Sequence, residues 1–313
     1  MREADLRTTR SPFAHIGHER LVTLCEEALP GLPDIEVLAF YDRGFHVFTI
    51  AEGDDEERRS LERAFRQLVT ENVRLDGLVR DFGTGELMRT FVMTEDAAVQ
   101  CGHVFEEEFL IGMTRDLAAA EEMDEQVARL VSRIRTEVYL QADQLPGGRR
   151  SPRETPGIEP AVLRTTAGEA ADPTLVADLV SCLGSLVDVN DLHYVAVYRD
   201  WRFLCAADVI DSPALAPWFG GAEGGEGARK LYQDFAARLR SDLPELAYSL
   251  RQLSEAPITR LVLDVVSGAI YVYPLPGSRG FAVGLTVFQP EVFVAENRLR
   301  EGLARLSELL GTG

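Results

Sequence analysis

The sequence predicts an α+β protein built from two tandem copies of one fold. Residues 25–41 read CEEALPGLPDIEVLAFY, and they align without a gap with residues 182–198, which read CLGSLVDVNDLHYVAVY. A second pair lies further along, where FLIGMT at 109–114 aligns with FAVGLT at 281–286. The offset between these blocks is the size of a domain, so the repeat predicts two domains and not a solenoid.

The domain boundaries follow from the repeat and from a change in composition between its copies. We expect an N-terminal tail at 1–17, a first domain at 18–140, a linker at 141–172 and a second domain at 173–313. The linker segment is dominated by proline, glycine and charged residues, a composition that has little to bury. A chain of 313 residues is long enough for two such domains, each with its own core.

The first copy shows helical and strand periodicities in a clear order. Helices are predicted where apolar residues recur three and four positions apart, and strands where β-branched and aromatic residues cluster between turn residues. The expected elements are a helix at 18–29, strands at 35–41 and 45–50, a helix from about 53 with an apolar stripe at 61–69, strands at 87–93, 97–102 and 108–114, and a helix at 117–140.

The second copy repeats this order. Its expected elements are a helix at 173–187, strands at 192–198 and 202–210, a helix at 228–254, strands at 258–266, 269–275 and 280–287, and a helix at 290–310. Each copy therefore reads α–β–β–α–β–β–β–α. Short hairpin connections between the strands imply a five-stranded antiparallel sheet in each copy, with helices packed against its faces.

This order of elements resembles the roadblock/dynein light chain family of the roadblock–longin superfamily. The resemblance is carried by IEVLAFYDRGFHVFTI at 35–50, by GELMRTFVMTEDAAVQCGHVFEEEFLIGMT at 85–114 and by APITRLVLDVVSGAIYVYPLPGSRGFAVGLTVF at 256–288. The second copy departs from the pattern in its first hairpin turn, where Asp200-Trp201 replaces Arg43-Gly44.

The resemblance implies both an assembly and a function. Members of the family dimerise through the central helix and a neighbouring edge strand, and bacterial members commonly bind small Ras-like GTPases, sometimes accelerating GTP hydrolysis. They have no nucleotide pocket of their own. For this chain the resemblance implies an intrachain pseudo-dimer or a homodimer that binds a small Ras-like GTPase.

Composition and charge narrow the functional classes. The net charge of −19 disfavours binding to nucleic acid and to anionic membrane surfaces, because both depend on clustered lysine and arginine. No apolar run approaches the roughly 20 residues that a membrane-spanning helix needs. The N-terminal residues lack the apolar core of a secretory signal. We therefore expect a cytoplasmic protein.

The motifs that could carry chemistry have plainer structural interpretations. The glycine cluster at 220–227 ends without the Lys-Ser/Thr pair of a phosphate loop, so we expect a flexible loop. His15 and His18 have a metal-like spacing, but the sequence offers no evident third ligand, so we expect a capping or surface role. The acidic run at 106–108 falls between two strands and predicts a solvated turn.

The remaining candidates are also read as structural. We expect surface positions for Arg89 and Arg260, which are equivalent in the repeat, although an arginine finger is the alternative. The histidines on predicted strands have no evident Ser or Cys partner and are read as ordinary strand residues. The four cysteines, Cys25, Cys101, Cys182 and Cys205, have no metal-like spacing. Cys25 and Cys182 are equivalent in the repeat and are interpreted as small buried residues.

The apolar stripes of the two central helices are the strongest candidate for an interface. Phe65 and Leu68 in the first copy correspond in role to Tyr232 and Phe235 in the second. Either these residues pack on the sheet of their own copy, or they form a contact between the copies.

Taken together, these observations predict a bacterial-type signalling protein without enzymatic activity, cofactor or metal. We expect it to regulate or scaffold a small Ras-like GTPase. The alternative is a sensory or structural protein-interaction module with no GTPase partner.

Overall fold

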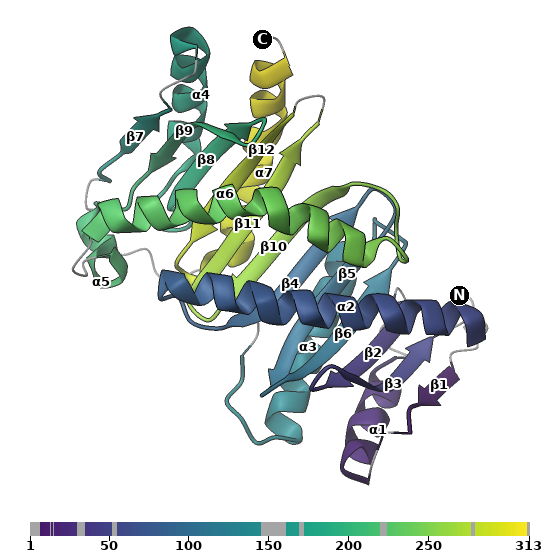
Figure 1. Ribbon diagram of the computed structural model, residues 1–313. Helices are drawn as coiled ribbons and strands as arrows, with labels where there is room; N and C mark the ends of the chain where they lie inside the picture. Colours follow the sequence, from purple (N-terminus) through teal and green to yellow (C-terminus); the bar gives the residue numbers. More distant parts are fainter. Residues whose placement is uncertain are drawn as a thin grey trace. The chain divides into compact units, whose positions relative to one another are not determined.

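The structure is a computed structural model that describes residues 7–12, 14, 16–29, 35–51, 55–144, 161–168, 172–219, 224–276 and 279–311. The chain forms two compact units. The first comprises Met1–Gly77, Leu87–Pro146 and Leu243–Thr259, and the second comprises Leu78–Glu86, Gly147–Asp242 and Arg260–Gly313. Both units mix helices with an antiparallel sheet (Figure 1), as the α+β prediction required.

The first unit contains strands in the spatial order β1-β3-β2-β6-β5-β4. Every neighbouring pair in this order is antiparallel. The strands are β1 (Arg7–Arg10), β2 (Val37–Asp42), β3 (Phe45–Ala51), β4 (Leu87–Thr94), β5 (Ala98–Phe105) and β6 (Glu108–Thr114).

Helices cover both faces of this sheet. The long helix α2 (Asp55–Val79) crosses one face, and α1 (Glu19–Ala28) and α3 (Ala120–Glu137) lie against the other (Figure 1). Both faces of the central strands are therefore apolar, and the burial pattern of β2 is continuous over Val37–Tyr41. A sheet covered on both faces reads as a continuous apolar run and not as an alternation.

The second unit repeats this arrangement with strands in the order β10-β11-β12-β8-β9-β7, again antiparallel throughout. The strands are β7 (Arg164–Ala167), β8 (Tyr194–Arg199), β9 (Arg202–Asp208), β10 (Ile258–Val265), β11 (Gly268–Leu275) and β12 (Gly280–Thr286). Helix α6 (Gly224–Leu250) crosses one face, and α4 (Pro173–Leu186) and α7 (Val292–Gly311) cover the other (Figure 1).

Short helices complete the connections between these elements. In the first unit η1 (Ile16–His18) leads directly into α1. The others are η3 (Arg80–Phe82), η4 (Pro213–Leu215), α5 (Ala216–Phe219) and η5 (Gln289–Glu291).

Two edge strands, β1 and β7, make each sheet six-stranded, so the expectation of five strands was wrong. β1 pairs with β3, and β7 pairs with β9. Arg7-Thr8-Thr9 and Arg164-Thr165-Thr166 are identical in sequence and have the same 157-residue offset as the first repeat block. The repeat therefore extends further toward the N-terminus of each copy than the sequence analysis recognised.

The first hairpin turn of each unit adopts the same backbone shape despite its different residues. Arg43 and Gly44 have φ of 50° and 75°, and Asp200 and Trp201 have φ of 50° and 63°. Positive φ at both central residues matches the right-handed twist of a two-residue hairpin. Trp201 therefore adopts a conformation that ordinarily favours glycine, and its ring lies 5.0 Å from that of Phe281.

Segments distant in sequence complete each unit. In the second unit, the backbone N–H groups of Val266 and Ser267 donate to the carbonyls of Glu86 (3.2 Å) and Thr84 (2.9 Å). In the first unit, Thr259 Oγ1 donates to the Met93 carbonyl at 3.2 Å. Each unit therefore draws on both halves of the sequence.

The helix expected at 228–254 begins earlier, at Gly224. Gly224, Gly225 and Gly227, which the sequence analysis read as loop, thus belong to its first turn. Residues 220–223 of the same glycine cluster lie outside the described residues. No helix among the residues that the structure describes has the length and apolar composition to cross a membrane.

Candidate functional site

The four residues predicted to form an interface are buried. Phe65 and Leu68 lie on α2 and are 0% and 1% exposed, and Tyr232 and Phe235 on α6 are each 4% exposed. In the second unit Phe82 contacts both Tyr232 and Phe235, with ring centroids 5.5 and 5.4 Å apart and the rings edge to face. All four side chains are buried core residues. Their role in contacts between the copies stays a prediction.

The expectation that Arg89 and Arg260 are surface charges was wrong, because both are buried. Arg89 forms an ion pair with Asp124 of α3. At the equivalent position in the second unit, Arg260 pairs with Glu296 of α7 through two bonds of 2.7 Å. In both units the arginine at the start of a strand thus ties the sheet to the last helix. Because their guanidinium groups are paired inside the protein, neither arginine is placed to reach a bound nucleotide.

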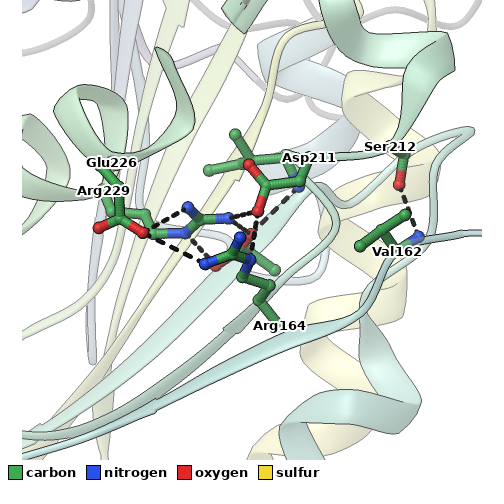
Figure 2. A network of polar contacts seen from close by, with 8 residues as sticks. Val162, Arg164, Asp211, Ser212, Glu226 and Arg229 are labelled. Carbon is green, nitrogen blue, oxygen red and sulfur yellow. Dashed lines mark hydrogen bonds and ion pairs between the residues drawn. The ribbon is translucent and has the colours of Figure 1, made fainter. Parts of the chain in front are cut away.

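Another buried arginine, Arg229, organises the polar network in Figure 2. Its Nε and NH2 bond to the two carboxylate oxygens of Asp208 at 2.8 and 2.7 Å, and NH2 also bonds to Asp211 Oδ2 at 2.9 Å. The pKa of Arg229 is raised, chiefly by the hydrogen bond to Asp208. Asp208 is 1% exposed, so its charge is compensated within the protein and not by water.

Arg164 connects the edge strand β7 to this network. Its side chain pairs with Asp211 and reaches Glu226 Oε1 at 3.3 Å, and Arg229 NH1 reaches the same oxygen at 3.3 Å (Figure 2). The Val162 N–H donates to Ser212 Oγ at 2.9 Å just before the strand. The network therefore holds β7 and the start of α6 together, which is a structural role.

The histidines on or beside strands are each accounted for by local contacts. His46 Nε2 lies 2.7 Å from Thr49 Oγ1, and burial lowers the pKa of His46. The His103 ring nitrogen donates to the Glu106 carbonyl at 2.6 Å. His193 is completely buried, and burial lowers its pKa to about 4. The interpretation of these histidines as structural residues is consistent with these contacts.

The cysteine thiols are not activated. Burial raises the pKa of Cys25 to about 12, and it also raises the pKa values of Cys101, Cys182 and Cys205. A thiol with a raised pKa is a poor nucleophile, because the thiolate is the reactive form. The prediction of a buried cysteine is confirmed for Cys25. Its counterpart in the repeat, Cys182, is only partly buried.

An open groove on the first unit is the feature best suited to contact another protein. It has a volume of about 390 Å³ and lies between α2 and the end of α6 that belongs to this unit. The groove is lined by Gln67, Glu71, Pro244, Glu245, Tyr248 and Ser249.

A large exposed side chain lines this groove. Tyr248 is 56% exposed. The Arg251 guanidinium stacks over the Tyr248 ring at 4.0 Å from the centroid, and this contact orients the ring. The sequence analysis did not single out Tyr248 because it followed the buried stripe of the helix; the available signal was an aromatic residue outside that stripe.

Fixed charges form the edges of the groove. Arg74 NH2 bonds to Glu71 Oε2 at 2.7 Å and to Glu245 Oε2 at 3.3 Å, so one arginine holds a carboxylate from each helix. The groove thus combines an oriented aromatic ring with carboxylates in defined positions. Such a surface can accept a side chain or a helix from a partner that carries basic residues.

In comparisons with known proteins, no family model and no curated protein sequence matches this chain, so its resemblance to the roadblock family supports a proposal and does not identify it.

Proposed function

We propose that this protein is a non-enzymatic regulator or scaffold that binds a small Ras-like GTPase through the groove between α2 and the end of α6. The observation that carries the proposal is the exposed Tyr248 side chain, which lines a groove with fixed carboxylates. A globular protein gains nothing in solubility from exposing such a ring, whereas a binding surface uses it as an anchor.

The chemistry of the groove favours a folded protein partner over a small molecule. The groove is open to solvent. Small-molecule sites are usually more enclosed. Tyrosine gives a large contact area with only two rotatable side-chain angles, so ordering it on binding costs little entropy. The carboxylates and the net charge of −19 favour a partner with a basic contact surface.

The choice of a small Ras-like GTPase rests on the resemblance to the roadblock family. Two copies of an antiparallel α+β unit with a long helix across one sheet face are consistent with that resemblance. Fold-level similarity is an analogy and not a demonstration of function. The proposal is therefore judged by a binding experiment.

The test uses the full chain and the small Ras-like GTPases encoded in the same genome, each loaded with GDP or with a non-hydrolysable GTP analogue. We expect one of them to bind in a way that depends on the nucleotide. The variant Tyr248→Glu should weaken binding at least about tenfold, because central aromatic anchors commonly contribute about 2 kcal/mol or more. Phe45→Glu is the matched control, since Phe45 is 54% exposed but does not line the groove.

Two results would overturn this proposal. Equal binding by Tyr248→Glu and the wild type would exclude the groove as the contact surface. If no GTPase binds in either nucleotide state, the alternative of an interaction module without a GTPase partner is favoured.

A further inference from the structure

Three potential metal ligands that are far apart in the sequence meet at one end of the first unit's sheet. His18 is the last residue of η1, Asp42 ends β2 and Glu108 begins β6. One ligand atom from each, the imidazole nitrogen and two carboxylate oxygens, lies within 4.8 Å of the other two. His18 Nε2 is 3.9 Å from Asp42 Oδ2, and the His18 side chain is 6% exposed. His18 is buried, so the expected surface position was wrong for it, and His15 lies outside the described residues.

Without a bound cation, the positions of the Asp42 and Glu108 carboxylates are energetically unfavourable. Asp42 and Glu108 are direct partners in the antiparallel pairing of β2 with β6. Like charges directly opposite each other on neighbouring strands are destabilising. Glu108 Oε2 is also buried and has no hydrogen-bond partner. A buried carboxylate oxygen without a partner is costly unless a cation or a donor compensates it.

The fold itself does not require this acidic pair, because the second unit lacks it. The same register position there joins Arg199 of β8 to Gly280 of β12. This pair carries one positive charge and no carboxylate, although its strands have the same order and pairing. The acidic pair is therefore a specific feature of the first unit.

The neighbouring groups leave one side of the cluster available for a cation. Arg43 Nε lies 3.7 Å from Asp42 Oδ1, the oxygen other than the one that faces His18, and the Arg43 side chain is 68% exposed. Tyr139 forms a hydrogen bond with Glu108. One oxygen of each carboxylate thus has a protein neighbour, while Asp42 Oδ2 and Glu108 Oε2 remain for a metal beside the His18 ring.

We propose that His18, Asp42 and Glu108 bind a divalent first-row transition metal ion of the zinc type. One imidazole and two carboxylates form a ligand set that suits such an ion, whereas magnesium and calcium prefer sites made entirely of oxygen. Three protein ligands leave a fourth position for water or for a group from a partner. Zinc bonds to nitrogen and oxygen are about 2.0–2.2 Å long, so tetrahedral ligand atoms lie about 3.4 Å apart. Binding therefore requires the three side chains to move closer together than their present separations of up to 4.8 Å.

The experiment is a calorimetric titration of the full chain with zinc chloride at about pH 8, above the value of about 7 to which burial raises the pKa of Glu108. We expect one zinc ion per chain and a higher melting temperature in its presence. The variants His18→Gln, Asp42→Asn and Glu108→Gln should each lower the affinity about 100-fold or more, since even the loss of an outer-shell partner costs 10- to 100-fold.

The matched control is Glu107→Gln, which removes an exposed carboxylate from the neighbouring turn and should leave zinc binding unchanged. Glu108→Gln removes one of two like charges without changing the side-chain shape, so we expect it to fold, and circular dichroism verifies this. The inference is overturned if the full chain binds no zinc, if the three ligand variants bind zinc as tightly as the wild type, or if magnesium or calcium binds more tightly than zinc.

Discussion

Arg260 and Glu296 form a buried, two-bond ion pair, with Nε–Oε1 and NH2–Oε2 distances of 2.7 Å. The pair joins the start of β10 to the N-terminal part of α7, and Tyr273 donates a further hydrogen bond to the same carboxylate. Arg89 and Asp124 form the equivalent pair in the first unit. In both units an arginine–carboxylate ion pair thus connects the sheet to the last helix, and the acid is aspartate in the first unit and glutamate in the second.

This pair predicts an asymmetric response to mutation. Glu296→Ala should destabilise the protein by about 3–5 kcal/mol, because Arg260 would be left buried without its counter-charge. Replacing both residues, with Arg260→Met and Glu296→Leu, should recover most of this loss, because no uncompensated charge remains. Urea unfolding of the two variants and the wild type measures the difference. A double variant as unstable as Glu296→Ala would contradict the explanation.

Two glycines at equivalent positions in the central strands should differ in their tolerance of a methyl group. A Cβ on Gly112 would lie 2.4 Å from Val127 Cγ2, whereas on Gly284 it would lie 2.7 Å from Leu299 Cδ2. Valine is stiff about χ1, while leucine can move its terminal methyl groups. Gly112→Ala should therefore cost about 1–3 kcal/mol of stability, and Gly284→Ala should cost less.

The explanation for Gly112 can be checked by removing the obstructing group. In a Val127→Ala background, Gly112→Ala should cost clearly less than in the wild type, because the Cγ2 atom is gone. Thermal or urea unfolding of the four proteins completes a double-mutant cycle. Additive costs would show that the contact with Val127 is not the cause.

His193 should make the stability depend on pH. Its Nδ1 accepts from the Val287 N–H at 3.1 Å and its Nε2 donates to the Val189 carbonyl at 3.2 Å, so the neutral ring is fully bonded. Its pKa is about 4 in the folded state, against an ordinary value of 6.5. Between these values the unfolded chain binds more protons, so stability falls as pH decreases from about 6.5 to about 4, by about 3 kcal/mol in total.

The contribution of His193 is isolated by comparing the wild type with His193→Gln. The variant should be less stable at neutral pH, but its stability should fall less steeply between about pH 6.5 and about pH 4. Urea unfolding at a series of pH values measures both slopes. Carboxylates elsewhere in the chain affect the two proteins alike, so identical slopes would contradict the assignment to His193.

The ion pairs around Arg229 should contribute unequally to the stability of the protein. Asp208→Ala should cost about 3–5 kcal/mol, because it leaves the buried Arg229 guanidinium short of its main partner. Arg164→Ala should cost less than about 1 kcal/mol, because the Arg164 side chain is 54% exposed and its ion pairs are screened by water. Urea unfolding compares the two variants, and a larger cost for Arg164→Ala would contradict this division.

The sequence by itself predicted the elements whose signals are local. The hairpin strands, the central helices and the last helix of each copy follow from apolar periodicity and from turn residues such as Asp42-Arg43-Gly44. These signals extend over one element or one hairpin, and the ungapped repeat between the copies reinforced them. The short edge strands β1 and β7 escaped notice, because four residues rich in threonine and arginine carry too little periodicity.

Only the tertiary structure decided which distant residues become neighbours. Strand order brought Asp42 beside Glu108 and placed His18 next to both, although nothing in the local sequence of any one of them indicates the other two. The same holds for the burial of Arg89 and Arg260, whose counter-charges lie on a helix more than thirty residues later. Pairing across a sheet is determined by the register of whole strands packed on a common core, and that register is a property of the complete unit and not of any segment within it.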